Sequence, residues 1–464
     1  MANATTASTV PQVGFDDIPV GKFHYKMMAL TYGAHFQDGY TLGVIGIALT
    51  AVTPALNLST LWVSLIASSA MIGLFIGSFG LGWVANKYGR AKIFTLNFIL
   101  ISICTFLQLF VQSAEQLFVL RLLIGIGLGG DYGVGHVMLA EFLPRKSRSI
   151  YLGAFAIFWT TGFVIASFVG YFMQQFLDQD YWRWLLFSAF PFAALVLILR
   201  FGTPESPRWL ISKGRVQEAN AIVHKYFGAH VTLDDELIGA GKVSAGKLSD
   251  LFGPKLIRRT AFNCLFCPAL VLPFFALYTF LPSILGYMGL ENNMTTALFL
   301  DLFLVLGTVW GIWCTLKFTR RGFTIFSFFF LGVALFLLGI IPDSMPYLII
   351  AIFAAYTLHI SGFNNMYGVY PSECFPTEVR TLGVGLATAA SRIGAALGTF
   401  VMPFSLDKLG VPGTMAWISG VLFLGGIVSI LWAPETKFAT LREASAGDDV
   451  VTTATGKAIP AQNG

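Results

Sequence analysis

The sequence carries little charge: Asp, Glu, Lys and Arg make up 11% of its 464 residues, whereas hydrophobic residues make up 56%. Soluble globular proteins carry charge at about 25% of their positions. The low charge therefore excludes an ordinary soluble domain and indicates an all-α integral membrane protein surrounded by a lipid bilayer. The net charge of +5 needs no nucleic-acid partner, because basic residues gather on the cytoplasmic loops of membrane proteins.

Cysteine is also scarce, with five residues in or beside apolar segments. Cys264 and Cys267 have C-x-x-C spacing, but they lack partner ligands, so we interpret them as packing residues and expect no metal. The chain lacks a nucleophile–base arrangement and a phosphate-binding loop, which argues against an enzyme and against ATP-driven transport. We expect no cofactor. The polar N-terminal segment lacks the basic region and apolar core of a signal peptide.

Long apolar segments are abundant. Twelve of them have about the 20 residues that cross a bilayer, near 25–50, 59–85, 91–112, 116–142, 148–173, 182–202, 260–286, 295–317, 322–341, 346–370, 378–403 and 413–433. Basic residues such as Lys87, Lys92 and Arg145 gather at one set of segment ends, while the opposite ends carry mostly acids. Basic residues favour the cytoplasmic side, so we expect both termini to be cytoplasmic.

Internal repetition organises these segments. AEFLPRKSR at 140–148 recurs as SECFPTEVR at 372–380, and PES at 204–206 recurs as PET at 434–436. Matches at nearly one offset indicate two six-helix halves in parallel repetition. We therefore expect a cytoplasmic tail at 1–23, a first half at 24–202, a cytoplasmic linker at 203–259, a second half at 260–434 and a cytoplasmic tail at 435–464.

The stretch Arg121–Arg148 combines many glycines with charges inside an apolar run. Glycine suits a membrane helix that packs closely on its neighbours. Arg121 and Asp131 would be charges within the hydrocarbon, which is costly enough to indicate function by default. The alternative is a purely structural buried ion pair.

Four sequence phrases carry a family resemblance: GWVANKYGRAK at 82–92, RLLIGIGLG at 121–129, PESPRWL at 204–210 and PSECFPTEVR at 371–380. They resemble the major facilitator superfamily, and within it the sugar-porter-like metabolite:proton symporters of bacterial inner membranes. The resemblance implies a monomeric secondary transporter that imports a small polar metabolite, an organic acid or sugar-like compound, with protons by alternating access.

Other functions stay open. GGDY at 129–132 also resembles the phosphate:proton symporters, but this chain lacks their glutamine in FWTTGF at 158–163 and their acid in 269–285. A proton antiporter of drugs or metabolites is a further alternative, although FVIASFVGY at 163–171 lacks the glycine–proline run of that group. A nutrient receptor on a transporter fold would favour long signalling domains.

Proton coupling is expected from three charges inside the membrane. A rise of 1.5 Å per residue puts Asp38 and Asp131 about 15–18 Å from the cytoplasmic helix ends, close to the midplane. Arg121 lies nearer the outer side. A carboxyl whose solvent access and cation contacts change between conformations can load and release a proton. The alternative for Asp38 is a permanent structural pair with Arg121, and His136 is either a proton relay or a packing residue.

Substrate binding is expected around Arg392, which comes out at a similar depth in the second half. Its guanidinium stays charged and needs an anionic partner, either a protein carboxylate or the substrate. Neutral hydrogen-bonding groups for the substrate come from Thr41, Tyr132, Asn364, Asn365 and Tyr367.

The family resemblance also implies a gating network of charges at the cytoplasmic helix ends. We expect it to comprise Glu141 with Arg148, Glu205 with Arg208, Glu373 with Arg380, and Arg90. Partly solvated ion pairs are individually weak, which suits a gate that opens and closes. The alternative is positive-inside anchoring with incidental acids.

Overall fold

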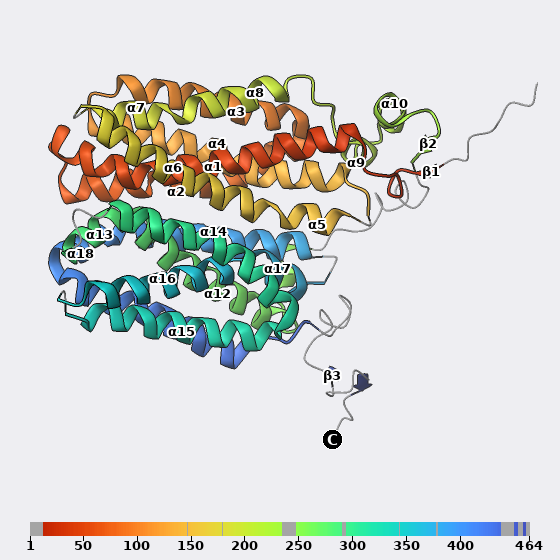
Figure 1. Cartoon of the computed structure of the whole chain (residues 1–464). Helices are drawn as coiled ribbons and strands as arrows, with labels where there is room; N and C mark the ends of the chain where they lie inside the picture. The colour runs from red at the N-terminus through yellow and green to blue at the C-terminus, as the bar shows by residue number, and fades with distance from the viewer. Residues whose placement is uncertain are drawn as a thin grey trace, which may run out of the picture.

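The computed structural model describes residues 13–145, 147–178, 180–233, 247–289, 294–342, 344–376 and 379–437, and the short strands at 450–452 and 458–460. Long helices run side by side in two groups, drawn from red to yellow for the first part of the chain and from green to blue for the second (Figure 1). The expected linker and both expected tails lie partly outside the described residues.

The first group contains the helices from α1 to α8. Their bounds are α1 (Lys22–Ala55), α2 (Thr60–Tyr88), α3 (Arg90–Leu107) with the short η1 (Gln108–Phe110), α4 (Ala114–Phe142), α5 (Arg148–Gly153), α6 (Phe155–Phe176), α7 (Tyr181–Phe187) and α8 (Ala189–Arg200). Helices α5 and α6 continue one another, as do α7 and α8.

The second group contains the helices from α12 to α18. They are α12 (Ile257–Thr279), α13 (Leu281–Tyr287), α14 (Met294–Lys317), α15 (Arg320–Ile340), α16 (Pro346–Phe363), α17 (Met366–Cys374) and α18 (Arg380–Trp432). Helix α18 contains a break at Gly410, whose φ of 64° lies outside the helical region. Strands β3 (Val450–Thr452) and β4 (Ala458–Pro460) pair antiparallel beyond it.

Along the chain, the two groups are connected by a segment that contains α9 (Pro207–Ser212), α10 (Val216–Phe227), β2 (Val231–Thr232) and η2 (Leu248–Phe252). Strand β1 (Val13–Gly14) pairs in parallel with β2, so the segment before α1 is tied to this connection. We call the end of the bundle that carries α9, α10 and these strands the linker end (Figure 1).

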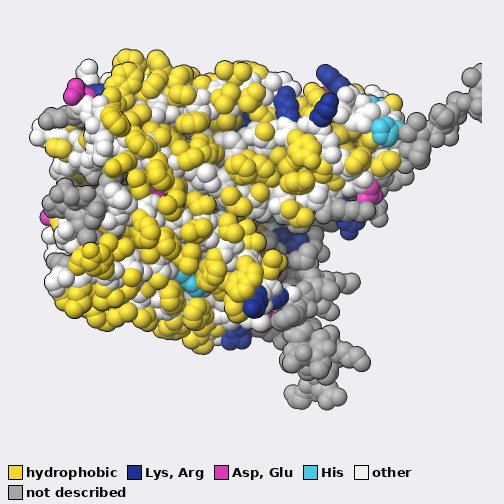
Figure 2. Space-filling view, in the orientation of Figure 1, with side chains coloured by type: hydrophobic (Ala, Val, Ile, Leu, Met, Phe, Trp, Pro, Cys, Tyr) yellow, Lys and Arg dark blue, Asp and Glu magenta, His cyan; other side chains and the backbone are white. Residues whose placement is uncertain are grey.

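Ten of the described helical segments are long and apolar enough to cross a membrane. That number leaves out the 34-residue α1 and counts α18 once. Hydrophobic side chains cover the flank of the bundle, and several Lys and Arg side chains gather toward the linker end (Figure 2). Ile198 of α8 and Leu316 of α14 are among the large apolar side chains that are exposed. Such a surface suits contact with lipid.

The glycines of α4 allow close helix packing, as the sequence predicts. A Cβ on Gly125 would lie 2.2 Å from the Ala70 carbonyl oxygen of α2, and one on Gly129 would lie 2.3 Å from that of Leu74. A side chain at either position would collide with backbone. Helices α2 and α4 therefore pack backbone to backbone, which holds the charges of α4 in fixed positions.

Candidate functional site

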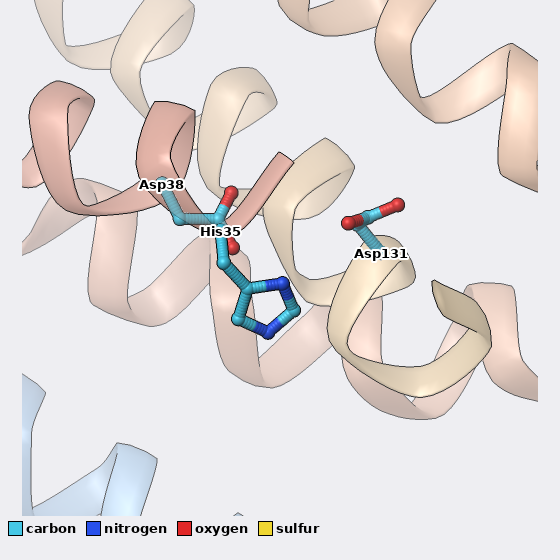
Figure 3. A group of neighbouring side chains, drawn as sticks. All are labelled: His35, Asp38 and Asp131. Atoms are coloured by element: carbon cyan, nitrogen blue, oxygen red, sulfur yellow. The ribbon is translucent and has the colours of Figure 1, made fainter. Parts of the chain in front are cut away.

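A cluster of ionisable side chains lies inside the first half. His35 and Asp38 come from adjacent positions on one face of α1, and Asp131 comes from α4 (Figure 3). All three are buried, and one ligand-type atom of each lies within 4.8 Å of the others. The sequence predicts the similar depth of Asp38 and Asp131, but it gives no role to His35, which lies three residues before Asp38.

Asp131 forms a buried ion pair that the sequence analysis misses. Arg200, the last residue of α8, donates from Nη1 to the Asp131 Oδ1 at 2.6 Å, and both side chains are 0% exposed. The same nitrogen donates to the Phe94 carbonyl at 2.6 Å, and the guanidinium carbon lies 3.4 Å from the Phe94 ring centroid. Asp131 thus has a full counter-ion in this conformation.

Asp38 has no such partner. Neither of its carboxylate oxygens has a hydrogen-bond partner within the described part of the chain, although the residue is 0% exposed. Burying a charged carboxylate without a donor or counter-ion is strongly unfavourable, whereas a protonated carboxyl avoids most of that cost. The site therefore favours a proton on Asp38 in this conformation.

Arg121 does not pair with Asp38 in the described structure. Its Nη1 donates to the Thr41 carbonyl oxygen at 3.1 Å, and its Nε and Nη2 have no partner among the described residues. The Thr41 hydroxyl accepts a hydrogen bond from the Gln37 amide at 3.0 Å. Arg121 and Thr41 thus form a neighbouring polar group, separate from the Asp131–Arg200 pair.

Arg392 of α18 reaches the first half. Its guanidinium carbon lies 4.7 Å from the centroid of the Tyr132 ring on α4, a cation–π geometry, and the residue is 5% exposed. Its Nε has no hydrogen-bond partner, and no ion pair involves it within the described residues. Asp38 lies near enough to interact with it electrostatically. Arg392 and Asp38 are thus a buried cation and a buried acid of the same region, without an ion pair between them in the described structure.

The other residues expected to bind substrate are less central. The Tyr367 hydroxyl lies 3.0 Å from that of Ser391, next to Arg392. The Asn365 amide donates to the Thr308 carbonyl at 3.0 Å, so it is turned toward α14. Asn364 is half-buried at the break between α16 and α17.

His136 connects the central cluster with the linker end. Its ring centroid lies 4.4 Å from that of His35, and it also lines a pocket of about 390 Å³ together with Glu141, Arg148 and Arg208. The three charged residues belong to the linker end of the bundle. The pocket therefore extends from the linker end to His136, which contacts His35, while His35, Asp38 and Asp131 do not line it.

At that end, the first half carries an ordered charge cluster. Arg90 forms an ion pair with Glu141, and the Ser206 hydroxyl donates to Glu141 at 2.5 Å. The Glu205 carboxylate accepts from the backbone N–H groups of Arg90 at 3.0 Å and Ala91 at 3.1 Å, at the start of α3. A carboxylate at a helix N-terminus accepts hydrogen bonds from the free backbone N–H groups, and its negative charge interacts favourably with the positive end of the helix dipole.

The second half repeats this arrangement. Arg320 forms an ion pair with Glu373 at 3.3 Å, and the Thr436 hydroxyl donates to Glu373 at 2.6 Å. The Glu435 carboxylate accepts from the backbone N–H groups of Arg320 at 3.0 Å and Arg321 at 3.1 Å. The repeated PES and PET phrases thus supply equivalent caps for α3 and α15. Sequence reasoning finds the repeat but assigns no role to Arg320 or Glu435.

One contact has no described equivalent in the second half. Asp16, before α1, accepts from Arg208 at 2.5 Å and from Arg148 at 3.3 Å. The sequence analysis groups Glu141 with Arg148 and Glu205 with Arg208, which are neighbours along the chain. In the structure Glu141 pairs with Arg90 instead, and Arg148 and Arg208 both pair with Asp16. Arg148 also donates to the Leu143 carbonyl, and Arg380 donates equivalently to that of Phe375. The ion pairs named above lie within one half, or they join Asp16 to Arg148 of the first half and to Arg208 of α9.

The Asp131–Arg200 pair leads to a stability prediction. Asp131→Asn would leave the Arg200 charge buried without a counter-ion, which typically costs about 3–5 kcal/mol. We expect a large drop in the melting temperature of the purified protein in detergent. The double variant Asp131→Asn with Arg200→Gln should recover much of the loss, because both charges are then gone. Equal losses in the single and double variants would show that the pair itself contributes little.

Comparisons with known proteins agree with this architecture. Residues 24–447 match the family described as "Sugar (and other) transporter". The inner membrane metabolite transport protein YgcS of Escherichia coli (strain K12) is 46% identical over 92% of this chain and 94% of its own length. The putative metabolite transport protein YaaU of the same organism is 35% identical over 94% and 97%.

The fold has a solved counterpart. The inward-open conformation of the xylose transporter XylE from E. coli superposes with a TM-score of 0.76, covering 91% of this chain and 99% of that one at 22% identity. The predictions of a major facilitator fold and of a multi-pass protein of the cell inner membrane are confirmed. The chain belongs to the "Sugar (and other) transporter" family of the major facilitator superfamily.

Proposed function

We propose that this protein imports a small metabolite carrying a negative charge, such as an organic acid, together with protons by alternating access. The observation that carries the proposal is Arg392: a buried guanidinium between the halves, stacked on Tyr132 and without an ion pair among the described residues. A cation in this setting needs an anion. A substrate carboxylate would supply one.

The balance of buried charge supports this substrate class. In the central region the buried cations are Arg121, Arg200 and Arg392, and the buried acids are Asp38 and Asp131. Arg200 neutralises Asp131. If Asp38 carries a proton, Arg121 and Arg392 lack anionic partners within the described structure. An anionic substrate would reduce this excess of positive charge, and Tyr132 and Tyr367 offer hydroxyl groups beside it.

Symported protons make the import of an anion feasible. The inside-negative membrane potential opposes entry of each negative charge by about 2.3 kcal/mol per 100 mV. One proton carried with each negative charge removes this opposition. Asp38 is our proposed carrier, because it is buried and unpartnered beside Arg392. Asp131 and Arg121 hold supporting positions, the first through Arg200 and the second through Thr41.

We also propose the full membrane topology. Including α1 and dividing α18 at Gly410 raises the ten apolar segments to twelve spans. Basic residues at the linker end, such as Lys87 and Lys317, support a cytoplasmic position for that end and for both termini. The halves then correspond to 24–202 and 260–434, with the linker at 203–259. The protein acts as a monomeric transporter and has no enzymatic activity.

The charge clusters at the linker end remain our proposed gate. In this conformation they brace each half internally, through Arg90 with Glu141 and through Arg320 with Glu373. When the halves approach at the linker end, Arg148, Arg208 and Arg380 would gain acids of the opposite half as partners. Such partly solvated pairs are weak enough to separate again.

Substrate counterflow in proteoliposomes tests the proposal without requiring a gradient. Vesicles loaded in turn with a sugar, a mono- or dicarboxylate or inorganic phosphate are diluted into the same compound with a radioactive label. We expect exchange with a carboxylate. Exchange restricted to neutral sugars would overturn the anionic substrate, and exchange of phosphate alone would favour the phosphate symporter alternative.

A further inference from the structure

A second, much smaller cavity lies at the end of the bundle opposite the linker. Its volume is about 20 Å³, and it lies between Gly43 and Gly46 of α1, Ser167 of α6, Tyr278 of α12 and Asp301 of α14. A cavity holds one water molecule when it offers at least about 10–15 Å³ and polar partners. The cavity is therefore large enough for one water molecule and too small for a metabolite.

Asp301 is the one charged residue that lines this cavity. It is 2% exposed, and its Oδ1 has no hydrogen-bond partner within the described structure. Ser167, from α6 of the opposite half, lines the same cavity and is the nearest source of a hydroxyl group on that side. None of the residues around the cavity offers a compensating positive charge. A single hydroxyl is a poor substitute for the hydration of a carboxylate.

The neighbouring titratable groups are tyrosines. Tyr278 lines the cavity, and its hydroxyl donates to the Thr357 hydroxyl of α16 at 2.7 Å, so its proton is already engaged. Tyr356, adjacent on α16, has a buried hydroxyl without a described partner. Helices α1 and α6 contribute glycine, apolar residues and Ser167. Asp301 is thus the acid whose charge would change here.

The burial of Asp301 depends on contact between the halves. A Cβ on Gly46 of α1 would lie 2.4 Å from the Thr279 carbonyl of α12, so the two backbones touch beside the cavity. The Thr308 hydroxyl of α14 donates to that of Thr160 on α6 at 3.3 Å. Separation of the halves at this end would expose Asp301 to water, and closure buries it again.

We propose that Asp301 is a second proton-binding site, which takes up a proton when the halves close at this end and releases it when they separate. The inference extends the proposed proton-coupled cycle, with Asp301 at the outer seal and Asp38 in the central cluster. No bond other than O–H forms or breaks: a hydronium ion of the outer solvent transfers its proton to the free Oδ1 and becomes water. Closure is therefore favoured as the pH falls.

Spin labels at two exposed positions of this end test the inference. Asn57 lies between α1 and α2 in the first half, and Tyr287 lies at the end of α13 in the second. Each is replaced by cysteine and labelled, with protein lacking the two new cysteines as the control for labelling of native ones. The Asp38→Asn background removes the central acid. Distances are measured in detergent between pH 5 and pH 9.

As the pH rises, the ratio of closed to open molecules should fall by up to about tenfold per pH unit, in the range where closure takes up one proton. Asp301→Asn should make this ratio independent of pH, whereas Asp301→Glu should keep the dependence. Ser167→Ala, which removes a hydroxyl group from the cavity wall but leaves the acid, should also keep it. An unchanged pH dependence in Asp301→Asn, or none in the parent protein, would overturn the inference.

Failure of the inference is distinguishable from failure of the proposed function. If Asp301→Asn removes the pH dependence while substrate uptake is independent of the pH gradient, the outer proton site is supported and proton symport is contradicted. If uptake depends on the pH gradient while closure at this end is independent of pH, proton symport is supported and the outer proton site is contradicted. Should Asp301→Asn fail to fold, the absence of a pH dependence in the parent protein or in Asp301→Glu would still overturn the inference.

Discussion

Arg392→Lys is expected to lower substrate affinity by about tenfold to a hundredfold. Lysine keeps the positive charge but loses the planar donor pair that matches a carboxylate, and it loses the flat surface that stacks on Tyr132. A hydrogen bond to a charged group contributes about 1.5–3 kcal/mol, which corresponds to this range. The measurement is the concentration dependence of counterflow with the substrate that the panel identifies.

The control is Arg215→Lys, because Arg215 is a solvent-exposed linker residue paired with Glu218. It should leave the affinity unchanged. Normal transport of a neutral sugar by Arg392→Lys would contradict the role of Arg392 as the anion-binding residue. A loss of folded protein would be visible separately in the melting temperature, so a stability defect is not mistaken for weaker binding.

Asp38→Asn is expected to abolish accumulation of the substrate against its gradient, while exchange of substrate for substrate continues. The amide resembles a protonated carboxyl in shape and lacks its charge, so the protein should resemble its proton-loaded form throughout the cycle. Asp38 has no donor or counter-ion to lose in the described conformation, and the variant should therefore fold. The measurement compares pH-driven uptake with counterflow in the same vesicles.

Asp180→Asn is the matched control, because Asp180 is an exposed aspartate whose side chain is 74% accessible. It should accumulate substrate normally. Accumulation by Asp38→Asn at the level of the unchanged protein would remove Asp38 from the coupling step. Loss of both accumulation and exchange would instead point to a role for Asp38 in binding the substrate.

Depth along a helix was enough to predict part of the site. Asp38 and Asp131 belong to different segments, yet a constant rise per residue predicts a common depth, and the structure brings their carboxylates together with His35. The same reasoning predicts the depth of Arg392, which reaches Tyr132 from the other half. Depth says nothing about rotation around the helix axis, however, and rotation decides which residues face each other.

The pairing of charges could not be predicted for that reason. In the sequence, Arg200 is a basic residue at the end of an apolar segment and gives no sign of a buried role. In the structure its side chain is buried and forms an ion pair with Asp131. Arg121 binds a backbone carbonyl instead of either aspartate. The repeated phrases correctly indicate equivalent positions in the two halves. They do not reveal that Glu205 and Glu435 cap helices distant in sequence, because a backbone N–H has no signature in the side-chain pattern.

Accumulation driven by a pH gradient alone is the most direct test of proton symport by this protein. Proteoliposomes are held at zero membrane potential with potassium and valinomycin, and their interior is made one pH unit more alkaline than the medium. We expect an anionic substrate to accumulate up to about tenfold for each coupled proton, and an ionophore that collapses the pH gradient to release it. Accumulation that is unaffected by the ionophore, or that requires an acidic interior as in an antiporter, would contradict proton symport.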